Sequence, residues 1–277
     1  MRRGFVVCSI CLVFIFMLCA CNDALPTLSL VATLPPTIQI STATPTMITT
    51  EIPSQTPELV TPILTPTPRK DGYTIESFPI IYQNPELPTG CEITALTMML
   101  HYYGFDVAKT TMASDYLPTI KSWRTYYDED GVRHGPNLYN FFLGDPYSEK
   151  GVICGAGAIE TAANKFFKDE LASYTAVNIT GAEVTDLYTY VEKNIPVFVC
   201  ITISMRDRGE LRGSWITEEG TTVDWTGRDH GGVLIGYTEN TVTIADPIAG
   251  RVTYQRAHFE SVYEQRGRQA VVLTDNL

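Results

Sequence analysis

Three residues far apart in the chain have the side chains that nucleophilic cysteine catalysis needs: Cys91, His230 and Asp246. In such a site the sulfur attacks a carbonyl carbon, the imidazole moves the proton, and the carboxylate orients the imidazole. The three can act together only if the elements that carry them converge.

The stretch 87–104 is expected to form a helix, because its apolar residues recur at helical spacing. Thr89 and Glu92 have the spacing of a capping box, and Gly104 suits the position after the last turn. The inward face consists of Ile93, Leu96, Met99, Leu100 and Tyr103.

Cys91 falls in the first turn of this expected helix. Unpaired amides and the positive end of the helix dipole meet there, and both favour a thiolate over a thiol. The alternative is an inert thiol under the fold, since free cysteine is often buried.

Two apolar stretches, 231–237 and 241–245, predict an antiparallel hairpin. In a hairpin the first strand starts beside the end of the second. His230 precedes the first stretch and Asp246 follows the second, so we expect them to be neighbours. The alternatives are an edge histidine and, before Pro247, an ordinary turn aspartate.

The order of the other elements indicates an α+β architecture rather than a doubly wound parallel sheet. Further helices are expected at 107–116, 157–169, 180–193, opened by a capping box of Thr180 and Glu183, and 257–265; further strands are expected at 78–83, 174–179, 196–204, 251–254 and 270–274. The irregular stretch 123–154 is expected to be a functional loop, and 206–228 an excursion at the sheet edge. Trp215 and Trp225 could wall a cleft or cap the core.

The N-terminus predicts export. Two arginines precede the apolar run 5–18, and Leu18-Cys19-Ala20-Cys21 resembles a bacterial lipobox with Cys21 as the lipidated residue. We expect a signal peptide at 1–21, a disordered Thr/Pro-rich linker at 22–72 and one domain at 73–277. The domain would be lipid-anchored on the extracytoplasmic face of a bacterial membrane; an uncleaved signal anchor is the alternative.

The composition restricts the classes of binding partner that we expect. The chain has 277 residues and a formal net charge of −11, which argues against nucleic acid. We expect a monomer without a cofactor. No metal is expected either, because the cysteines and histidines show no close-spaced zinc-binding pairs. Beyond Cys21, the chain keeps Cys91, Cys154 and Cys200; a disulfide between the last two is an open alternative.

The segment Leu87-Pro-Thr-Gly-Cys-Glu-Ile-Thr-Ala-Leu-Thr-Met-Met-Leu, with Tyr102-Tyr103-Gly104, closely resembles the stand-alone bacterial branch of bacteriocin-processing (double-glycine leader) cysteine peptidase-like domains. The resemblance continues through Phe142-Leu-Gly-Asp-Pro, Asn178-Ile-Thr-Gly-Ala, Trp225 and Ala245-Asp-Pro, and covers 78–273. It implies a papain-like fold, in which a nucleophile helix packs on an antiparallel sheet.

The resemblance also implies roles for single residues. Cys91 would be the nucleophile, His230 the base and Asp246 its orienting partner. Gln83 matches the family glutamine that helps to form the oxyanion hole, although the spacer 84–90 is longer than in exporter-linked peptidases.

We therefore expect a cysteine peptidase or amidase that acts on a peptide or protein substrate through a thioester acyl-enzyme. An acyltransferase or transpeptidase would use the same three residues, and a peptide-binding module could have kept the fold without turnover. The sequence shows no exporter transmembrane or ATPase segments, so cleavage of a double-glycine leader is not expected to transfer.

Overall fold

The computed structural model describes residues 71–275. The expected signal peptide, the lipidated Cys21 and nearly all of the expected linker lie outside the described residues. Within 71–275, no helix is both long and apolar enough to cross a membrane.

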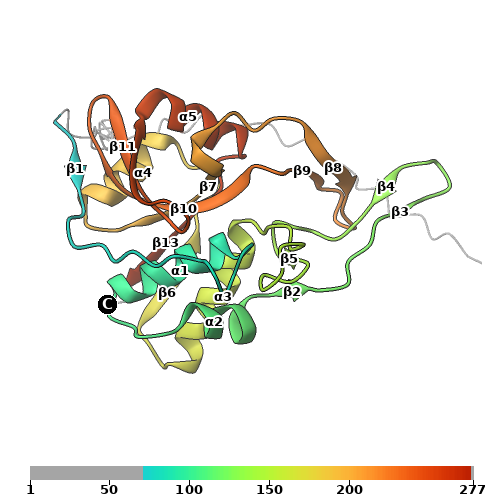
Figure 1. Ribbon diagram of the computed structural model, residues 1–277, viewed down its shortest axis with the longest axis horizontal. Coiled ribbons are helices and arrows are strands. Elements are labelled where there is room, and N and C mark those ends of the chain that lie inside the picture. The colour runs from blue at the N-terminus through green and yellow to red at the C-terminus, as the bar shows by residue number, and fades with distance from the viewer. Residues whose placement is uncertain (1–70, 276–277) are drawn as a thin grey trace, which may run out of the picture. The chain divides into compact units, whose positions relative to one another are not determined.

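A seven-stranded antiparallel sheet forms the centre of the domain, in the order β12-β11-β10-β7-β13-β6 with β1 paired to β10 (Figure 1). Its strands are β1 (Tyr73–Thr74), β6 (Tyr174–Asn178), β7 (Val197–Thr202), β10 (Asp229–Tyr237), β11 (Thr241–Asp246), β12 (Gly250–Gln255) and β13 (Ala270–Asp275). The pairing of β10 with β11, with Val233 opposite Ala245, confirms the predicted hairpin.

Helices cover both faces of this sheet. α1 (Cys91–Tyr102) and α3 (Ala156–Asp169) lie on one face, and α4 (Val184–Glu192) and α5 (Arg256–Gln265) lie on the other (Figure 1). The helix expected at 107–116 is instead a short α2 (Lys109–Thr111) followed by a π-helical turn, Met112–Tyr116. Helices on an antiparallel sheet confirm the α+β prediction.

α1 has almost no solvent face. Every residue from Cys91 to Leu100 is buried, because the helix is enclosed by β10, β7, α3 and the π-helical turn. The hydroxyls of Thr94 and Thr97 donate to carbonyls one turn earlier, each at 2.7 Å, so burial leaves these polar atoms satisfied. A helix buried on all sides holds its first turn in a fixed place.

The capping box predicted for α1 is wrong. Gly90 is the N-cap, and the hydroxyl of Thr89 donates to the carbonyl of Ser148 at 2.9 Å. Glu92 turns into the core rather than back to the helix end. The other end is as predicted: Gly104, with φ of +89°, follows the last turn.

The second predicted capping box, at Thr180 and Glu183, is also wrong. Glu183 is itself the N-cap of α4, and no side chain caps that end. The hydroxyl of Thr180 donates to Oδ1 of Asn178 at 2.6 Å instead. Packing of the helix's inward face therefore holds α4; its buried members are Leu187, Tyr188 and Val191.

A second, four-stranded sheet in the order β3-β4-β8-β9 accounts for part of the two stretches expected to be irregular. Its strands are β3 (Tyr126–Tyr127), β4 (Arg133–His134), β8 (Leu211–Ile216) and β9 (Thr222–Thr226), and nearby β2 (Thr119–Ile120) pairs in parallel with β5 (Phe142–Leu143). Trp215 is buried in a separate hydrophobic cluster under this sheet and donates to the carbonyl of Pro136 at 2.8 Å. Trp225 packs on the same cluster, so both tryptophans serve this core.

Leu96→Ala tests the burial of α1. Leu96 is 0% exposed, so the truncation should lower the free energy of unfolding by about 2–5 kcal/mol through lost contacts and a residual cavity. Urea denaturation would measure it. Leu171→Ala, the same change at a side chain that is 92% exposed, should cost less than about 0.5 kcal/mol. Equal effects of the two substitutions would contradict the buried position of α1.

Candidate active site

His230 and Asp246 meet at the open end of the β10–β11 hairpin. Nε2 of His230 lies 3.1 Å from Oδ1 of Asp246, and the two residues are 1% and 2% exposed. The pair is within ion-pair distance, but the ring N–H is not aligned for a regular hydrogen bond. Because Nε2 faces the carboxylate, Nδ1 is the nitrogen left for exchange of a proton with a nucleophile or a leaving group.

Backbone amides fix the Asp246 carboxylate. Its Oδ1 accepts hydrogen bonds from the amides of Ile248 at 2.7 Å and Ala249 at 3.1 Å. Burial alone would raise the pKa of Asp246, but the contact with His230 and the two amides lower that pKa below its ordinary value. The carboxylate is thus ionised at neutral pH and holds the imidazole from one side.

Cys91, the first residue of α1, lies against the start of β10. The backbone amide of Gly231, next to His230, hydrogen-bonds the Cys91 sulfur, and the charge of Asp246 also acts on it. The structure therefore brings the three predicted residues to one place. The other histidines contact other groups: Val107 O for His101, Asp128 for His134 and Met205 O for His258.

The protonation state of Cys91 differs from the expectation. Burial raises the pKa of the Cys91 thiol well above its ordinary value, and the neighbouring Glu92 raises it further. The Gly231 amide acts in the opposite direction and is outweighed. The prediction of a favoured thiolate is therefore wrong for this state of the protein: a position in the first helical turn does not compensate for a side chain that is 8% exposed beside a carboxylate.

Gln83 connects the loops on either side of this site. Its backbone amide donates to the carbonyl of Pro247 at 2.9 Å, directly after Asp246. Its Nε2 donates to the carbonyl of Pro88 at 2.8 Å, in the loop that leads to Cys91. The side chain is buried, and one of its two Nε2 hydrogens serves Pro88, which leaves the second for another acceptor.

Glu92 is the residue that the sequence prediction misplaced. It is 0% exposed, and burial raises its pKa to about 7. A Cβ atom at Gly231 would lie 2.9 Å from Cγ and 3.0 Å from Cα of Glu92, so the side chain fits only because residue 231 is glycine. The Gly231-Gly232 pair was the one signal in the sequence for such a close approach.

A buried cluster of charges lies next to His230. Asp229 accepts from Nε of Arg208 and from Nη1 of Arg266, both at 3.0 Å, and from the hydroxyl of Thr226 at 2.9 Å. Two guanidinium groups thus share one carboxylate, which is how a protein can hold such charges away from water. No sequence signal pointed to this cluster except the position of Asp229 directly before His230.

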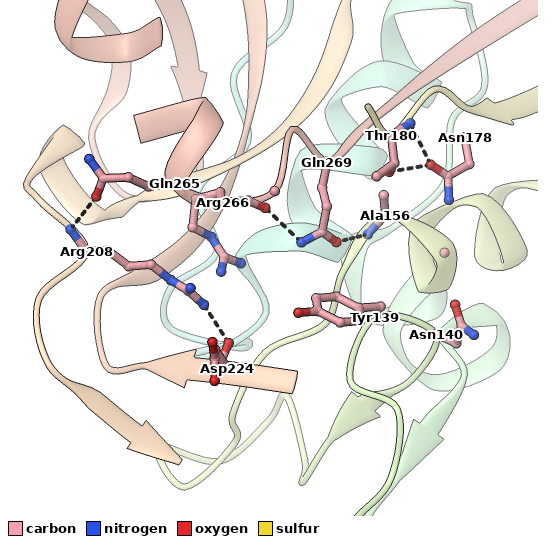
Figure 2. A pocket seen from close by; sticks show the side chains of 12 residues that line it. Tyr139, Asn140, Ala156, Asn178, Thr180, Arg208, Asp224, Gln265, Arg266 and Gln269 are labelled. Atoms are coloured by element: carbon pink, nitrogen blue, oxygen red, sulfur yellow. Dashed lines mark hydrogen bonds between the residues drawn. The ribbon is translucent and has the colours of Figure 1, made fainter. Parts of the chain in front are cut away.

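Figure 2 shows a cavity of about 380 Å³ beside this cluster. Arg208, Arg266 and Tyr139 line it, together with Gln269, whose Oε1 accepts the amide of Ala156 at the start of α3 at 3.1 Å. No predicted site residue lines this cavity. The cavity is therefore linked to His230 through Arg266 and Asp229, and Cys91 is not among the residues that line it.

The other two cysteines within residues 71–275 are buried in the core. Cys154 and Cys200 are free and 0% exposed, so the disulfide considered between them does not form. Burial raises the pKa of Cys200 to about 12 and that of Cys154 well above its ordinary value. Within residues 71–275, no three His, Cys, Asp or Glu side chains are arranged to hold a metal ion.

Comparison with known proteins shows which family this chain resembles. The model of the Peptidase_C39 like family matches residues 75–271. The chain is 31% identical over 191 residues to the "Uncharacterized protein YvpB" of Bacillus subtilis (strain 168), covering 68% of this chain and 70% of that protein. A solved chain from Bacillus anthracis, described as a C39-like peptidase, superposes with a TM-score of 0.63 at 30% identity, over 74% of this chain and 98% of that one.

Asp246→Asn tests the electrostatics of the pair. The folded pKa of Asp246 is lowered, so its ionised form stabilises the fold above the unfolded pKa of about 3.9 and loses that effect as pH falls through the folded value. The stability difference between wild type and Asp246→Asn should be full near neutral pH and shrink below about pH 4. Urea denaturation at a series of pH values measures it.

Asp130→Asn, the same change at an exposed position, serves as the control and should show no such trend. A difference for Asp246→Asn that grew on acidification would contradict the lowered pKa.

Proposed function

The chain belongs to the Peptidase_C39 like family, and from this premise we propose that it is an extracytoplasmic, membrane-tethered cysteine peptidase or amidase. The observation that carries the proposal is the His230–Asp246 pair beside the first turn of α1. The papain-like α+β fold expected from the sequence agrees with the family match and with the solved Bacillus anthracis chain. This fold supplies the scaffold for the proposed chemistry.

In the proposed reaction, the Cys91 sulfur attacks the carbonyl carbon of a peptide or amide bond. His230 takes the thiol proton and then gives it to the leaving amine, which departs and leaves a thioester on Cys91. Water then hydrolyses the thioester, and His230 again moves the proton. Asp246 keeps its negative charge throughout and stabilises the imidazolium between these transfers.

The raised pKa of Cys91 favours one version of this mechanism. The resting nucleophile is a thiol, so His230 must remove the proton as the substrate binds rather than hold a preformed thiolate–imidazolium pair. A bound substrate that excludes water from the site would strengthen the electrostatic attraction between the Asp246 carboxylate and the imidazolium. This attraction would assist the proton transfer to His230.

Two donors suit the oxyanion of the tetrahedral intermediate. The amide of Cys91 lies at the N-terminus of α1, where amides have no helical partner. The second Nε2 hydrogen of Gln83 is the other candidate, and the bonds of Gln83 to Pro88 and Pro247 would preorganise it. Loss of one such donor typically costs about a hundredfold or more in rate.

Cys91→Ala tests the proposed enzyme. The wild-type protein in detergent should hydrolyse members of a peptide and acyl-amide library and react with a peptidyl electrophile, and Cys91→Ala should lose both. Cys154→Ala removes another buried free thiol and should retain activity. If Cys91→Ala cleaved every responsive substrate at the wild-type rate, the mechanism would be wrong. Product that carries an added amine would show acyl transfer instead of hydrolysis.

Membrane attachment is part of the same proposal. The lipobox-like Leu18-Cys19-Ala20-Cys21 supports a lipid on Cys21, and the Thr/Pro-rich residues that follow would space the domain from the bilayer. Peptide-like substrates would then come from the envelope or the exterior.

Cys21→Ser tests this attachment. In a bacterial host, the wild-type protein should incorporate labelled fatty acid and fractionate with membranes, whereas Cys21→Ser should lose the label because it lacks the acceptor thiol. Cys19→Ser is the matched control and should keep the label. Equal labelling of Cys21→Ser and wild type would exclude Cys21 as the lipidated residue.

A further inference from the structure

The carboxylate of Glu92 is unusual in three respects. It directly follows the proposed nucleophile, it is 0% exposed, and neither of its oxygens accepts a hydrogen bond of regular geometry among the described residues. The donors close to it are the Cys91 thiol and the backbone amide of Glu92 itself. Catalysis by Cys91, His230 and Asp246 does not require it. A buried carboxylate without a regular hydrogen bond or a direct ion pair costs free energy, so its presence beside the thiol calls for a physical explanation.

Arg266 carries the positive charge that can stabilise a negative charge on Glu92. Its side chain is 2% exposed; Nη1 pairs with Asp229 at 3.0 Å, while Nε and Nη2 have no hydrogen-bond partner within residues 71–275. These two nitrogens are closed off from solvent, although Arg266 is among the residues that line the cavity of Figure 2. The charge of Arg266 acts on both Glu92 and Cys200.

The buried charges therefore alternate in sign from the cavity to the nucleophile. Arg208 and Arg266 share Asp229, Arg266 acts on Glu92, and Glu92 acts on Cys91. Interactions in such a series are strong, because little water is present to screen them.

We propose that Glu92 is a positioning residue that keeps the Cys91 thiol protonated in the resting protein, and that Arg266 stabilises the negative charge by which it does so. The inference rests on Cys91 being the nucleophile of the proposed function. The titratable or charged groups that act on Glu92 or on Cys91 come from every element packed around them. They are His230 on β10, Asp246 on β11, Cys200 on β7, Cys154 before α3 and Arg266 after α5.

A thiol that is kept protonated in this way is a weak nucleophile in the resting protein. It reacts slowly with adventitious electrophiles and oxidants, which attack the thiolate. It becomes reactive when His230 takes its proton or when Glu92 is itself neutralised. The pKa of Glu92, about 7, lies where modest acidification would weaken the restraint.

The test is the pH dependence of Cys91 alkylation by iodoacetamide in the full-length protein, read for each cysteine by peptide mass spectrometry. In Glu92→Gln, which keeps the shape and removes the charge, the midpoint for Cys91 should fall by about one pH unit or more, and alkylation at neutral pH should rise about tenfold. Glu92→Asp, which keeps the charge, should stay near the wild-type midpoint. Glu129→Gln makes the same change at an exposed site and should have no effect.

Arg266 is tested through Glu92 itself. The Glu92 side-chain carboxyl carbon, assigned as the NMR signal that Glu92→Gln lacks, should titrate at higher pH in Arg266→Gln than in wild type. If Arg266→Gln does not fold, Arg266→Lys keeps the charge for Asp229 and should leave the midpoint near wild type.

The outcomes separate this inference from the proposed function. A reactive Cys91 whose midpoint is the same in wild type and Glu92→Gln would overturn the role of Glu92 and leave the enzyme proposal intact. A Cys91 that reacts no faster than Cys154 and Cys200 at every pH, in every variant, would overturn both.

Discussion

The candidate site depends on one contact: the first turn of α1 lies directly on the backbone of Gly231 at the start of β10. A Cβ at that position would come within 3.0 Å of Glu92, so the absence of a side chain lets helix and strand approach. The same approach places the Cys91 sulfur on the Gly231 amide, one residue from His230. The hairpin then places Asp246 beside the imidazole. Without the close approach, the thiol and the imidazole would belong to separate layers of the fold.

Close packing determines the chemistry as well as the geometry. The interior that holds α1 in place also removes water from Cys91, His230, Asp246 and Glu92, all of them buried. Desolvation raises the pKa values of Cys91 and Glu92, whereas amides and His230 keep Asp246 ionised. The two carboxylates therefore differ in their readiness to carry charge, because Asp246 accepts two aligned amide hydrogen bonds and Glu92 accepts none of regular geometry.

Much of this arrangement could be predicted from the sequence, because it follows from periodicity and hairpin geometry. The α1 pattern, Gly104 after its last turn, the β10–β11 hairpin and the meeting of His230 with Asp246 all depend on local signals. Tertiary contacts decided the rest. Thr89 binds the carbonyl of Ser148, 59 residues away, instead of capping the helix, and the neighbourhood of Glu92 includes an arginine more than a hundred residues later in the chain. The prediction of a Cys91 thiolate was wrong for the same reason, because the burial of a side chain is a property of the assembled fold.

The rate of Cys91 alkylation in His230→Ala, compared with wild type at neutral pH, tests the central claim most directly. The account predicts a large fall in that rate with the far-ultraviolet spectrum and the slow labelling of Cys154 and Cys200 unchanged, because His230 is the group that takes the proton from a thiol otherwise held protonated. Equal rates in the two proteins would mean that the imidazole and the sulfur do not work together, and the shared site would have to be abandoned.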